Sequence, residues 1–190
     1  MIAGLLLAAG GARRFGTQKL VATLDGAPLV RHAASHLAND VDALVIVVGA
    51  SSDALRAALV GIPAVLVDNQ DWQQGLATSI RLGISALPPD ADCVVIALGD
   101  EPRVERDVIR RVVAVWRSTG APIVAPRYQG RRGHPVLFSR LMFGDLSALH
   151  GDTGARTIIG AHASDVAYVD MDAMGPSDID TPADLERLRQ

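Results

Sequence analysis

A glycine-rich loop close to the N-terminus carries residues suited to phosphate chemistry. It contains Gly10, Gly11 and Gly16, and two basic residues, Arg14 and Lys19, stand at its exit. Backbone N–H groups of such a loop can surround phosphate oxygens while the basic side chains neutralise their charge. The spacing matches neither the Gly-x-Gly-x-x-Gly dinucleotide pattern nor the P-loop. The loop could be a tight turn that binds no ligand, but the two basic residues at its exit favour a phosphate-binding loop.

Lys19 is unusual because of its rarity. It is the one lysine among 18 basic residues, the others being arginines, and it lies at the end of this short loop. A position that needs a compact, mobile ammonium group resists replacement by the planar guanidinium of arginine. We therefore expect Lys19 to contact phosphate groups.

Two aspartates offer hard oxygen ligands for Mg²⁺. Asp100 follows the apolar run Cys93–Leu98 in the sequence Gly-Asp-Glu-Pro, and Asp180 precedes a predicted C-terminal helix. Mg²⁺ takes one or two carboxylates and fills its other positions with water and substrate phosphates. Each aspartate also suits a structural role, Asp100 in a turn and Asp180 as a helix cap, so the residues alone leave both roles open.

The apolar pattern of the chain predicts an α/β fold that would position these residues. Six short apolar runs alternate with stretches of helical periodicity, which is typical of a mostly parallel central sheet covered by helices. We expect a single domain over residues 1–190 with a Rossmann-like three-layer fold. The predicted strands are Ile2–Ala9, Ala43–Val48, Ala64–Val67, Cys93–Leu98, Ile123–Ala125 and Val166–Val169. The predicted helices are Pro28–Leu37, Asp53–Val60, Gly75–Leu87, Val108–Trp116 and Thr181–Arg189.

The segment Arg127–Phe138 interrupts this alternation, because glycines and two further arginines separate short β-like ends. We expect it to form a small β-hairpin excursion over the C-terminal edge of the sheet, where open α/β sheets bind ligands. Arg131 and Arg132 of the excursion, together with Arg156, could then receive a phosphorylated molecule.

Composition narrows the class of partner. A net charge of −3 and a pI near 5.9 give no general attraction to nucleic acid or to anionic membranes, so we expect a small ligand and neither of those partners. The first apolar stretch, of about eight residues, is too short to span a bilayer and lacks a basic leader, which predicts a cytoplasmic protein. Cys93 is the only cysteine and is expected to be an inert core thiol.

The stretch Leu7-Ala-Ala-Gly-x-x-x-Arg-x-Gly-x-x-Lys19 resembles the signature of the nucleotidyltransferase superfamily that activates sugars, isoprenoid precursors and molybdopterin. Its members usually carry Ser or Thr near Ala12 and Met at Phe15, so this chain departs at two uncharged positions. The resemblance implies that a nucleoside triphosphate is bound by Leu7, Ala8, Ala9, Gly10, Gly11, Arg14 and Lys19. It further implies catalysis by Arg14, Lys19 and Asp100, with Mg²⁺ held by Asp100 and Asp180.

The segment Gly75-Leu-Ala-Thr-Ser79 is similar to one that lies near the pyrimidine in cytidylyltransferases. The resemblance implies that the backbone at Gly75 and the hydroxyl of Ser79 contact the base. Ser79 could instead be a serine within a helix that bonds to its own backbone.

Two later segments resemble the molybdopterin cytidylyltransferase branch in particular. They are Tyr128-Gln-Gly-Arg-Arg-Gly-His-Pro135 and Gly151-Asp-Thr-Gly-Ala-Arg156, and with them the resemblance covers nearly the whole chain. It implies transfer of CMP from CTP to the terminal phosphate of molybdopterin, with release of pyrophosphate. The acceptor-binding residues would be Arg131, Arg132, His134 and Arg156.

Several alternatives stay open. They are guanylyl transfer to the same acceptor, cytidylyl transfer to another small phosphorylated acceptor, and a non-catalytic molybdopterin carrier or chaperone. The expected product could be delivered by transient contact with a molybdenum hydroxylase or its chaperone. His134 precedes a proline and could also have a structural role in a turn. His32 and His36 lie four residues apart without a third ligand nearby, so we expect ordinary helix residues.

Overall fold

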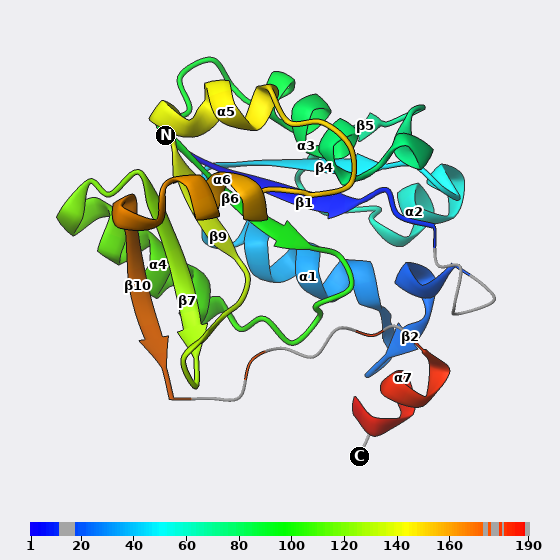
Figure 1. Cartoon of the computed structure of the whole chain (residues 1–190). Helices are drawn as coiled ribbons and strands as arrows, with labels where there is room; N and C mark the ends of the chain where they lie inside the picture. Colours follow the sequence, from blue (N-terminus) through cyan, green and yellow to red (C-terminus); the bar gives the residue numbers. More distant parts are fainter. Residues whose placement is uncertain (12–17, 173–174, 176–178, 180, 189–190) are drawn as a thin grey trace.

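The structure is a computed structural model that describes residues 1–11, 18–172, 175, 179 and 181–188. It is an α/β fold in which helices flank an eight-stranded, mostly parallel sheet (Figure 1). Across the sheet the strand order is β10-β7-β9-β6-β1-β4-β5, and β8 pairs with β7 alone. The strands are β1 (Ile2–Ala8), β4 (Ala43–Val48), β5 (Val65–Asp68), β6 (Cys93–Leu98), β7 (Ile123–Tyr128), β8 (Arg131–Arg132), β9 (Val136–Ser139) and β10 (Val166–Met171).

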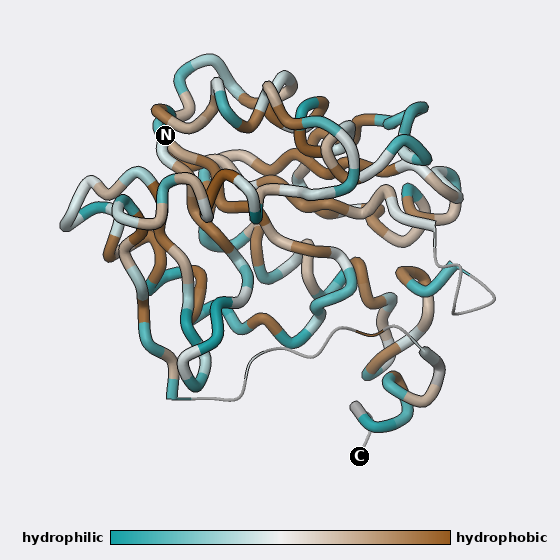
Figure 2. The backbone as a smooth tube through the Cα atoms, in the orientation of Figure 1, coloured by the Kyte–Doolittle hydropathy of each residue, from teal (hydrophilic) through white to brown (hydrophobic). Residues whose placement is uncertain are grey.

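Strand β1 lies in the interior of the sheet, and its sequence explains why. Every residue of the strand is buried, and β1 pairs in parallel with β4 on one side and with β6 on the other. A strand covered on both faces must be apolar throughout rather than alternating, which is the pattern Ile-Ala-Gly-Leu-Leu-Leu-Ala. Figure 2 shows the hydrophobic residues concentrated along the central strands.

Successive side chains of the central strands point to opposite faces and divide the core in two. Leu6, on one face, packs with residues of α1 (Leu29–Ala38), α2 (Ser52–Ala58) and α4 (Arg106–Thr119). On the other face, Leu5 packs with residues of α3 (Leu76–Ser85), α5 (Phe143–Ser147) and α6 (Arg156–Ala161). Four short 3-10 helices span Lys19–Val21, Trp72–Gln74, Arg140–Met142 and Ala163–Asp165.

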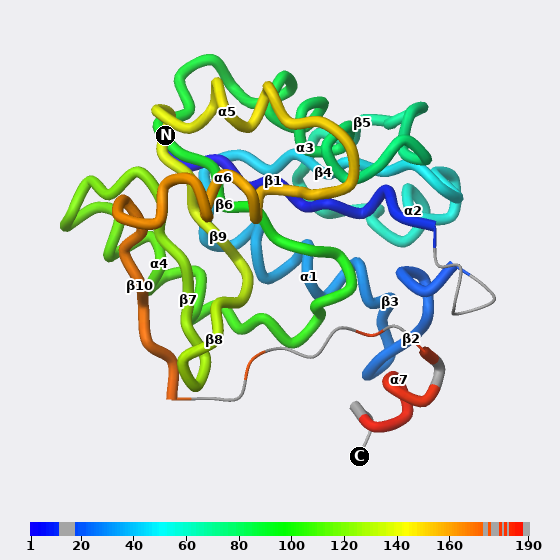
Figure 3. Tube along the Cα trace, in the orientation of Figure 1, coloured from blue at the N-terminus to red at the C-terminus, as the bar shows by residue number. Residues whose placement is uncertain are grey.

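A separate two-stranded sheet lies beside the C-terminal helix, as Figure 3 shows. Its strands are β2 (Thr23–Leu24) and β3 (Ala27–Pro28), and the helix is α7 (Pro182–Leu188). Leu24, Leu29, Ile179 and Leu185 form a small apolar cluster between these elements. This cluster attaches the end of the chain to the region that follows the glycine-rich loop.

The predicted fold class is confirmed, since the sheet is mostly parallel and carries a small hairpin. The prediction that Arg127–Phe138 forms a hairpin excursion was right only in part. Strands β7 and β8 form the hairpin, but β9 enters the main sheet between β6 and β7 and runs antiparallel to both. All four β9 residues are buried, so this run is a central strand and not part of an excursion.

The short helices α5 and α6 were not predicted, because five or six residues are too few to show a helical period. Within the described part of the chain, no helix has the length and apolar character needed to cross a bilayer.

Candidate functional site

The candidate site lies at the C-terminal edge of the parallel strands, along the ends of β1, β4 and β6 and of β7, which is farther along the sheet (Figure 1). Leu7, Ala8 and Ala9 are buried at the end of β1. The N–H of Gly99 donates to the carbonyl of Leu7 at 3.0 Å, and the N–H of Ala50 donates to that of Ala9 at 3.1 Å. The loops after β4 and β6 are therefore attached directly to the start of the glycine-rich loop.

Trp72, which the sequence did not single out, packs against the glycine-rich loop. A Cβ atom at Gly11 would lie 2.9 Å from the Trp72 ring, and one at Gly49 would lie 3.0 Å from Trp72 Cβ. Both positions therefore need glycine for this close approach. Gly10 meets no neighbour in this way and is exposed. The predicted Arg14 lies outside the described residues.

A buried polar network holds the Trp72 loop in place. The side-chain amide of Asn69 donates to the hydroxyls of Thr78 and Ser79 at 2.8 and 2.9 Å, and its oxygen accepts from the N–H of Asp71 at 3.0 Å. Ser79 is 4% exposed. Its hydroxyl thus accepts a bond inside the protein, and its contact with a base stays a prediction. Asn69 was not predicted, and a lone asparagine after a strand gives no specific signal.

Gly75 brings two of the predicted motif segments together. Its φ of +113° suits glycine, and a Cβ here would lie 2.6 Å from the carbonyl oxygen of Gly151. At the start of α3, the N–H of Ala77 donates to the Gly151 carbonyl at 3.1 Å, and that of Leu76 donates to an Asp152 carboxylate oxygen at 3.2 Å. The segment with Gly75 and the segment Gly151–Arg156 are therefore neighbours in the fold.

Lys19 and Asp100 meet at the edge of the sheet. The Nζ atom of Lys19 lies 2.7 Å from Oδ2 of Asp100, and the two side chains are 14% and 25% exposed. The structure thus brings together the two charged residues that were predicted on separate loops. Among the described residues, no group of three or more His, Cys, Asp or Glu side chains is arranged to hold a metal ion. Asp180, the second predicted ligand, lies outside the described residues.

A cavity of about 660 Å³ has in its lining Leu98, the last residue of β6. Glu101, which follows Asp100 in the chain, is part of its lining. All four residues that were predicted to bind the acceptor also line it, namely Arg131, Arg132, His134 and Arg156. Its apolar wall consists of Leu76, Ile96, Leu98, Val136, Phe138 and Ile159. The cavity thus combines a cationic group of side chains with an apolar surface.

Glu101 is a site residue that the sequence did not reveal. It is 5% exposed, and its Oε1 lies 3.0 Å from Nδ1 of His134, whose side chain is 38% exposed. The sequence places Glu101 between Asp100 and Pro102, but nothing in it shows that the side chain turns inward toward His134.

Tyr128 supports the same corner of the cavity. Its hydroxyl donates to the His134 carbonyl at 3.2 Å. Burial raises the pKa of Tyr128 to about 12, and the negative charges of Glu101 and Glu105 add to this shift. The hydroxyl therefore stays protonated and remains a donor over the physiological pH range.

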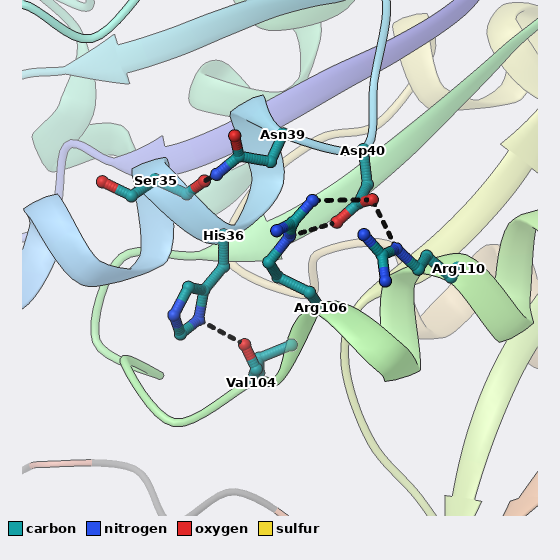
Figure 4. Close-up of polar contacts among 7 residues, drawn as sticks. All are labelled: Ser35, His36, Asn39, Asp40, Val104, Arg106 and Arg110. Carbon is teal, nitrogen blue, oxygen red and sulfur yellow. Dashed lines mark hydrogen bonds and ion pairs between the residues drawn. The ribbon is translucent and has the colours of Figure 1, made fainter.

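His32 and His36 contact separate backbone carbonyls. His32 Nε2 lies 2.7 Å from the Leu24 oxygen, and His36 Nδ1 lies 2.7 Å from the Val104 oxygen (Figure 4). They join neighbouring elements, in keeping with the expectation of ordinary helix residues. Burial raises the pKa of the Cys93 thiol to about 12, which agrees with the expected inert thiol.

Asp40, just beyond α1, joins this helix to α4 (Figure 4). It accepts hydrogen bonds from Nε of Arg106 at 3.0 Å and from Nε of Arg110 at 2.8 Å. Burial opposes ionisation of Asp40, yet the two arginines outweigh it and lower its pKa. With the His36 contact to Val104, this ion pair fixes both the far end of the Asp100 loop and the start of α4.

Known proteins resemble the chain over most of its length. A nicotine blue oxidoreductase from Paenarthrobacter nicotinovorans is 30% identical over 98% of this chain and 96% of its own. A molybdenum cofactor guanylyltransferase from Cereibacter sphaeroides is 35% identical over 70% of this chain and 65% of its own. The crystal structure of Rv0371c from Mycobacterium tuberculosis superposes with a TM-score of 0.88 at 32% identity, over 99% of this chain and 97% of that one. A second structure of Rv0371c is a complex with manganese.

A family model also matches the chain. It is the model of the MobA-like NTP transferase domain, and the match extends over residues 4–166, from the first strand to the last strand of the sheet. The matched region thus includes the glycine-rich loop, the Lys19–Asp100 pair and most of the cavity lining. The chain belongs to the MobA-like NTP transferase family.

Proposed function

We propose that this NTP transferase moves CMP from CTP to the terminal phosphate of molybdopterin and releases pyrophosphate. The observation that carries the proposal is the cavity whose lining includes Glu101, the residue that follows Asp100 in the chain. Its three arginines suit a phosphate group, and its apolar wall suits a flat ring system. A phosphorylated heterocycle such as molybdopterin presents both features.

Mg²⁺ is the metal that we propose, and the donor set of the site fits it. Asp100 contributes a hard carboxylate that is partly exposed at the end of β6, and Asp180 would be a second ligand. An ion that takes one or two protein carboxylates and completes its shell with water and triphosphate oxygens does not need a preformed cluster of three side chains. When bound, Mg²⁺ would neutralise phosphate charge at the reacting phosphorus.

The protein's own part in the reaction is alignment and charge neutralisation. The acceptor phosphate is already a nucleophile at neutral pH, so the reaction needs no general base. Its oxygen attacks the α-phosphorus of CTP, and the bond to the bridging oxygen of pyrophosphate breaks. Lys19 would leave Asp100 for the triphosphate, and together with Arg14 and the loop N–H groups it would stabilise the charge that builds up there.

The choice of CTP rather than GTP as the donor depends on specific residues. Ala8 and Ala9 precede the loop where the guanylyl branch tends to have glycines, and Gly75 and Ser79 would contact the pyrimidine; both points favour CTP. Guanylyl transfer to the same acceptor is the second candidate, because a relative at 35% identity bears the name molybdenum cofactor guanylyltransferase. A molybdenum hydroxylase or its chaperone would receive the product by transient contact.

The test is pyrophosphate release, measured with each of the four NTPs in turn, with Mg²⁺ and molybdopterin present. We expect release with CTP, and only when both Mg²⁺ and molybdopterin are added. Release with GTP instead would replace the cytidylyl assignment by the guanylyl one. Binding of molybdopterin without an NTP, and without any pyrophosphate, would make the protein a carrier.

A further inference from the structure

Glu101 is a buried carboxylate in the lining of the cavity. Its side chain is 5% exposed although it belongs to the short loop after β6. Removing a carboxylate from water costs several kcal/mol unless hydrogen bonds and charges compensate. Oε1 of Glu101 lies 3.0 Å from Nδ1 of His134, which also lines the cavity. The pair therefore joins two loops that both line the acceptor cavity.

The segment that carries His134 is held from several directions, so the ring has a defined place. The N–H of Gly133 donates to the Pro126 carbonyl at 3.1 Å, and the Tyr128 hydroxyl donates to the His134 carbonyl at 3.2 Å. A Cβ at Gly133 would lie 2.7 Å from the Tyr128 ring, so the backbone packs directly on this ring. Backbone position is thus fixed without Glu101, and Glu101 acts on the orientation of the imidazole.

A carboxylate accepts but does not donate, so its partner nitrogen must carry the proton. Nδ1 of His134 is therefore the N–H nitrogen, and Nε2 is the ring nitrogen that remains for a ligand in the cavity. We infer that Glu101 is a positioning residue for the acceptor, which holds His134 in the Nδ1–H form so that Nε2 accepts a hydrogen bond from an N–H group of the acceptor's ring system. This inference rests on the proposed function, because it assumes that the acceptor binds in this cavity.

The surrounding charges explain why a carboxylate acts through a histidine here. Arg131, Arg132 and Arg156 line the same cavity and attract an anionic acceptor. A carboxylate that faced the acceptor directly would repel its phosphate. With the His134 ring between them, the negative charge of Glu101 orients the ring and stays away from the acceptor.

The first measurement identifies the ring nitrogen of His134 that carries the proton, and it does not depend on turnover. In protein with ¹⁵N-labelled histidine, the chain gives five imidazole signals, and the His134→Gln variant identifies the one that belongs to His134. In alkaline solution we expect His134 to carry its one ring proton on Nδ1. We also expect its Nε2 signal to shift when molybdopterin is added.

The second measurement is a double-mutant cycle with Glu101→Gln and His134→Gln. Each single variant should raise the KM for molybdopterin about tenfold, roughly the effect of one hydrogen bond, and leave the KM for CTP unchanged. Because Glu101 acts through His134, the double variant should be no worse than His134→Gln alone. Glu105→Gln, an exposed glutamate in the same loop, is the matched control and should change neither KM.

Each result decides the inference. A proton on Nε2 of His134 in the wild type, an Nε2 signal that does not respond to molybdopterin, or additive effects in the cycle would overturn it. An unresponsive signal together with normal cytidylyl transfer would overturn the role of Glu101 and leave the proposed function intact. A responsive Nε2 signal without pyrophosphate release would contradict the proposed transfer and retain the acceptor contact.

Discussion

Lys19 and Asp100 form an ion pair at the sheet edge, although the proposed reaction assigns them different partners. Both side chains are largely shielded from solvent, so their attraction is screened less than that of a surface pair. Under the proposed function, the pair would keep the ammonium group next to the triphosphate. Binding of the nucleotide and binding of the metal are therefore expected to depend on each other, because Lys19 must leave Asp100 before this carboxylate can hold a cation.

Replacement of Lys19 tests the catalytic assignment. We expect Lys19→Ala to lower turnover about 100-fold or more, the typical effect of removing one preorganised positive group from a reacting centre. Its cost in the free energy of unfolding should stay near 1 kcal/mol, because Asp100 can still be solvated. Turnover and urea unfolding are measured on the same preparation.

The matched control is Arg103→Ala, which removes the exposed ion pair between Arg103 and Asp25 at 3.0 Å. We expect little change in either quantity for this variant. Equal losses of turnover and stability in Lys19→Ala would show that Lys19 is needed for folding rather than for catalysis.

At the scale of elements, contacts between loops and helices place the site residues. The start of α3 is fixed on Gly151 and Asp152 through Gly75, and the N-terminal end of α4 is fixed on α1 through Asp40. The Asp40 contact involves no residue that would touch a substrate, whereas Gly75 would also contact the base. Both determine where the loops at the C-terminal edge of the sheet can lie.

Gly75→Ala should distort the nucleotide site more than an ordinary glycine substitution does. Its φ of +113° is strained for alanine, and the new Cβ would lie 2.6 Å from a backbone oxygen. Gly61→Ala is the matched control, with a φ of +83° and no atom within 4 Å of the new Cβ. We expect both variants to lose about 1 kcal/mol or more of stability, and only Gly75→Ala to weaken CTP binding. Equal CTP affinities, measured by calorimetry, would contradict a role for this contact in the nucleotide site.

The Asp40 ion pair should make stability depend on pH in the acid range. The arginines lower the pKa of Asp40 in the folded protein, so its stabilising effect is present above its unfolded pKa of about 4 and is lost as the pH falls through the folded pKa. We expect Asp40→Asn to cost about 1–2 kcal/mol at pH 7, as for hydrogen bonds to a charged group, and less below about pH 4.

Urea unfolding at several pH values measures this dependence. Asp90→Asn, at an exposed position before β6, is the control and should follow the wild type. A cost for Asp40→Asn that is the same at pH 3 and pH 7 would show that the charge of Asp40 contributes nothing to joining α1 and α4.

At the scale of the whole molecule, ligand binding should stabilise the fold by mass action. We expect CTP with Mg²⁺ to raise the Tm, with a gain of about 2.7 kcal/mol at a ligand concentration 100 times the Kd. CTP with EDTA should give a clearly smaller shift, since Asp100 then has no cation to share with the triphosphate. Thermal shifts with CTP and with GTP, each with and without Mg²⁺, measure this. Equal shifts for both nucleotides would contradict selectivity for cytosine.

The sequence by itself determined the fold class and predicted where the site would lie. Apolar runs such as Ile2–Ala9 and Cys93–Leu98 are strand signals, since a strand buried on both faces must be apolar throughout. Parallel strands place their C-terminal loops at one edge, so the glycine-rich loop and Asp100 were expected to be neighbours. These inferences use only local pattern and a general rule of topology.

Only the tertiary structure decided which side chains face one another. The burial of Glu101 against His134, the packing of Trp72 on Gly11 and the entry of β9 into the sheet all join residues that lie far apart in the chain. No local pattern encodes such contacts, because a buried glutamate and an exposed one look the same in a sequence. Lys19 and Asp100 show the same division, since the sequence identified each residue and the structure showed that they bind each other.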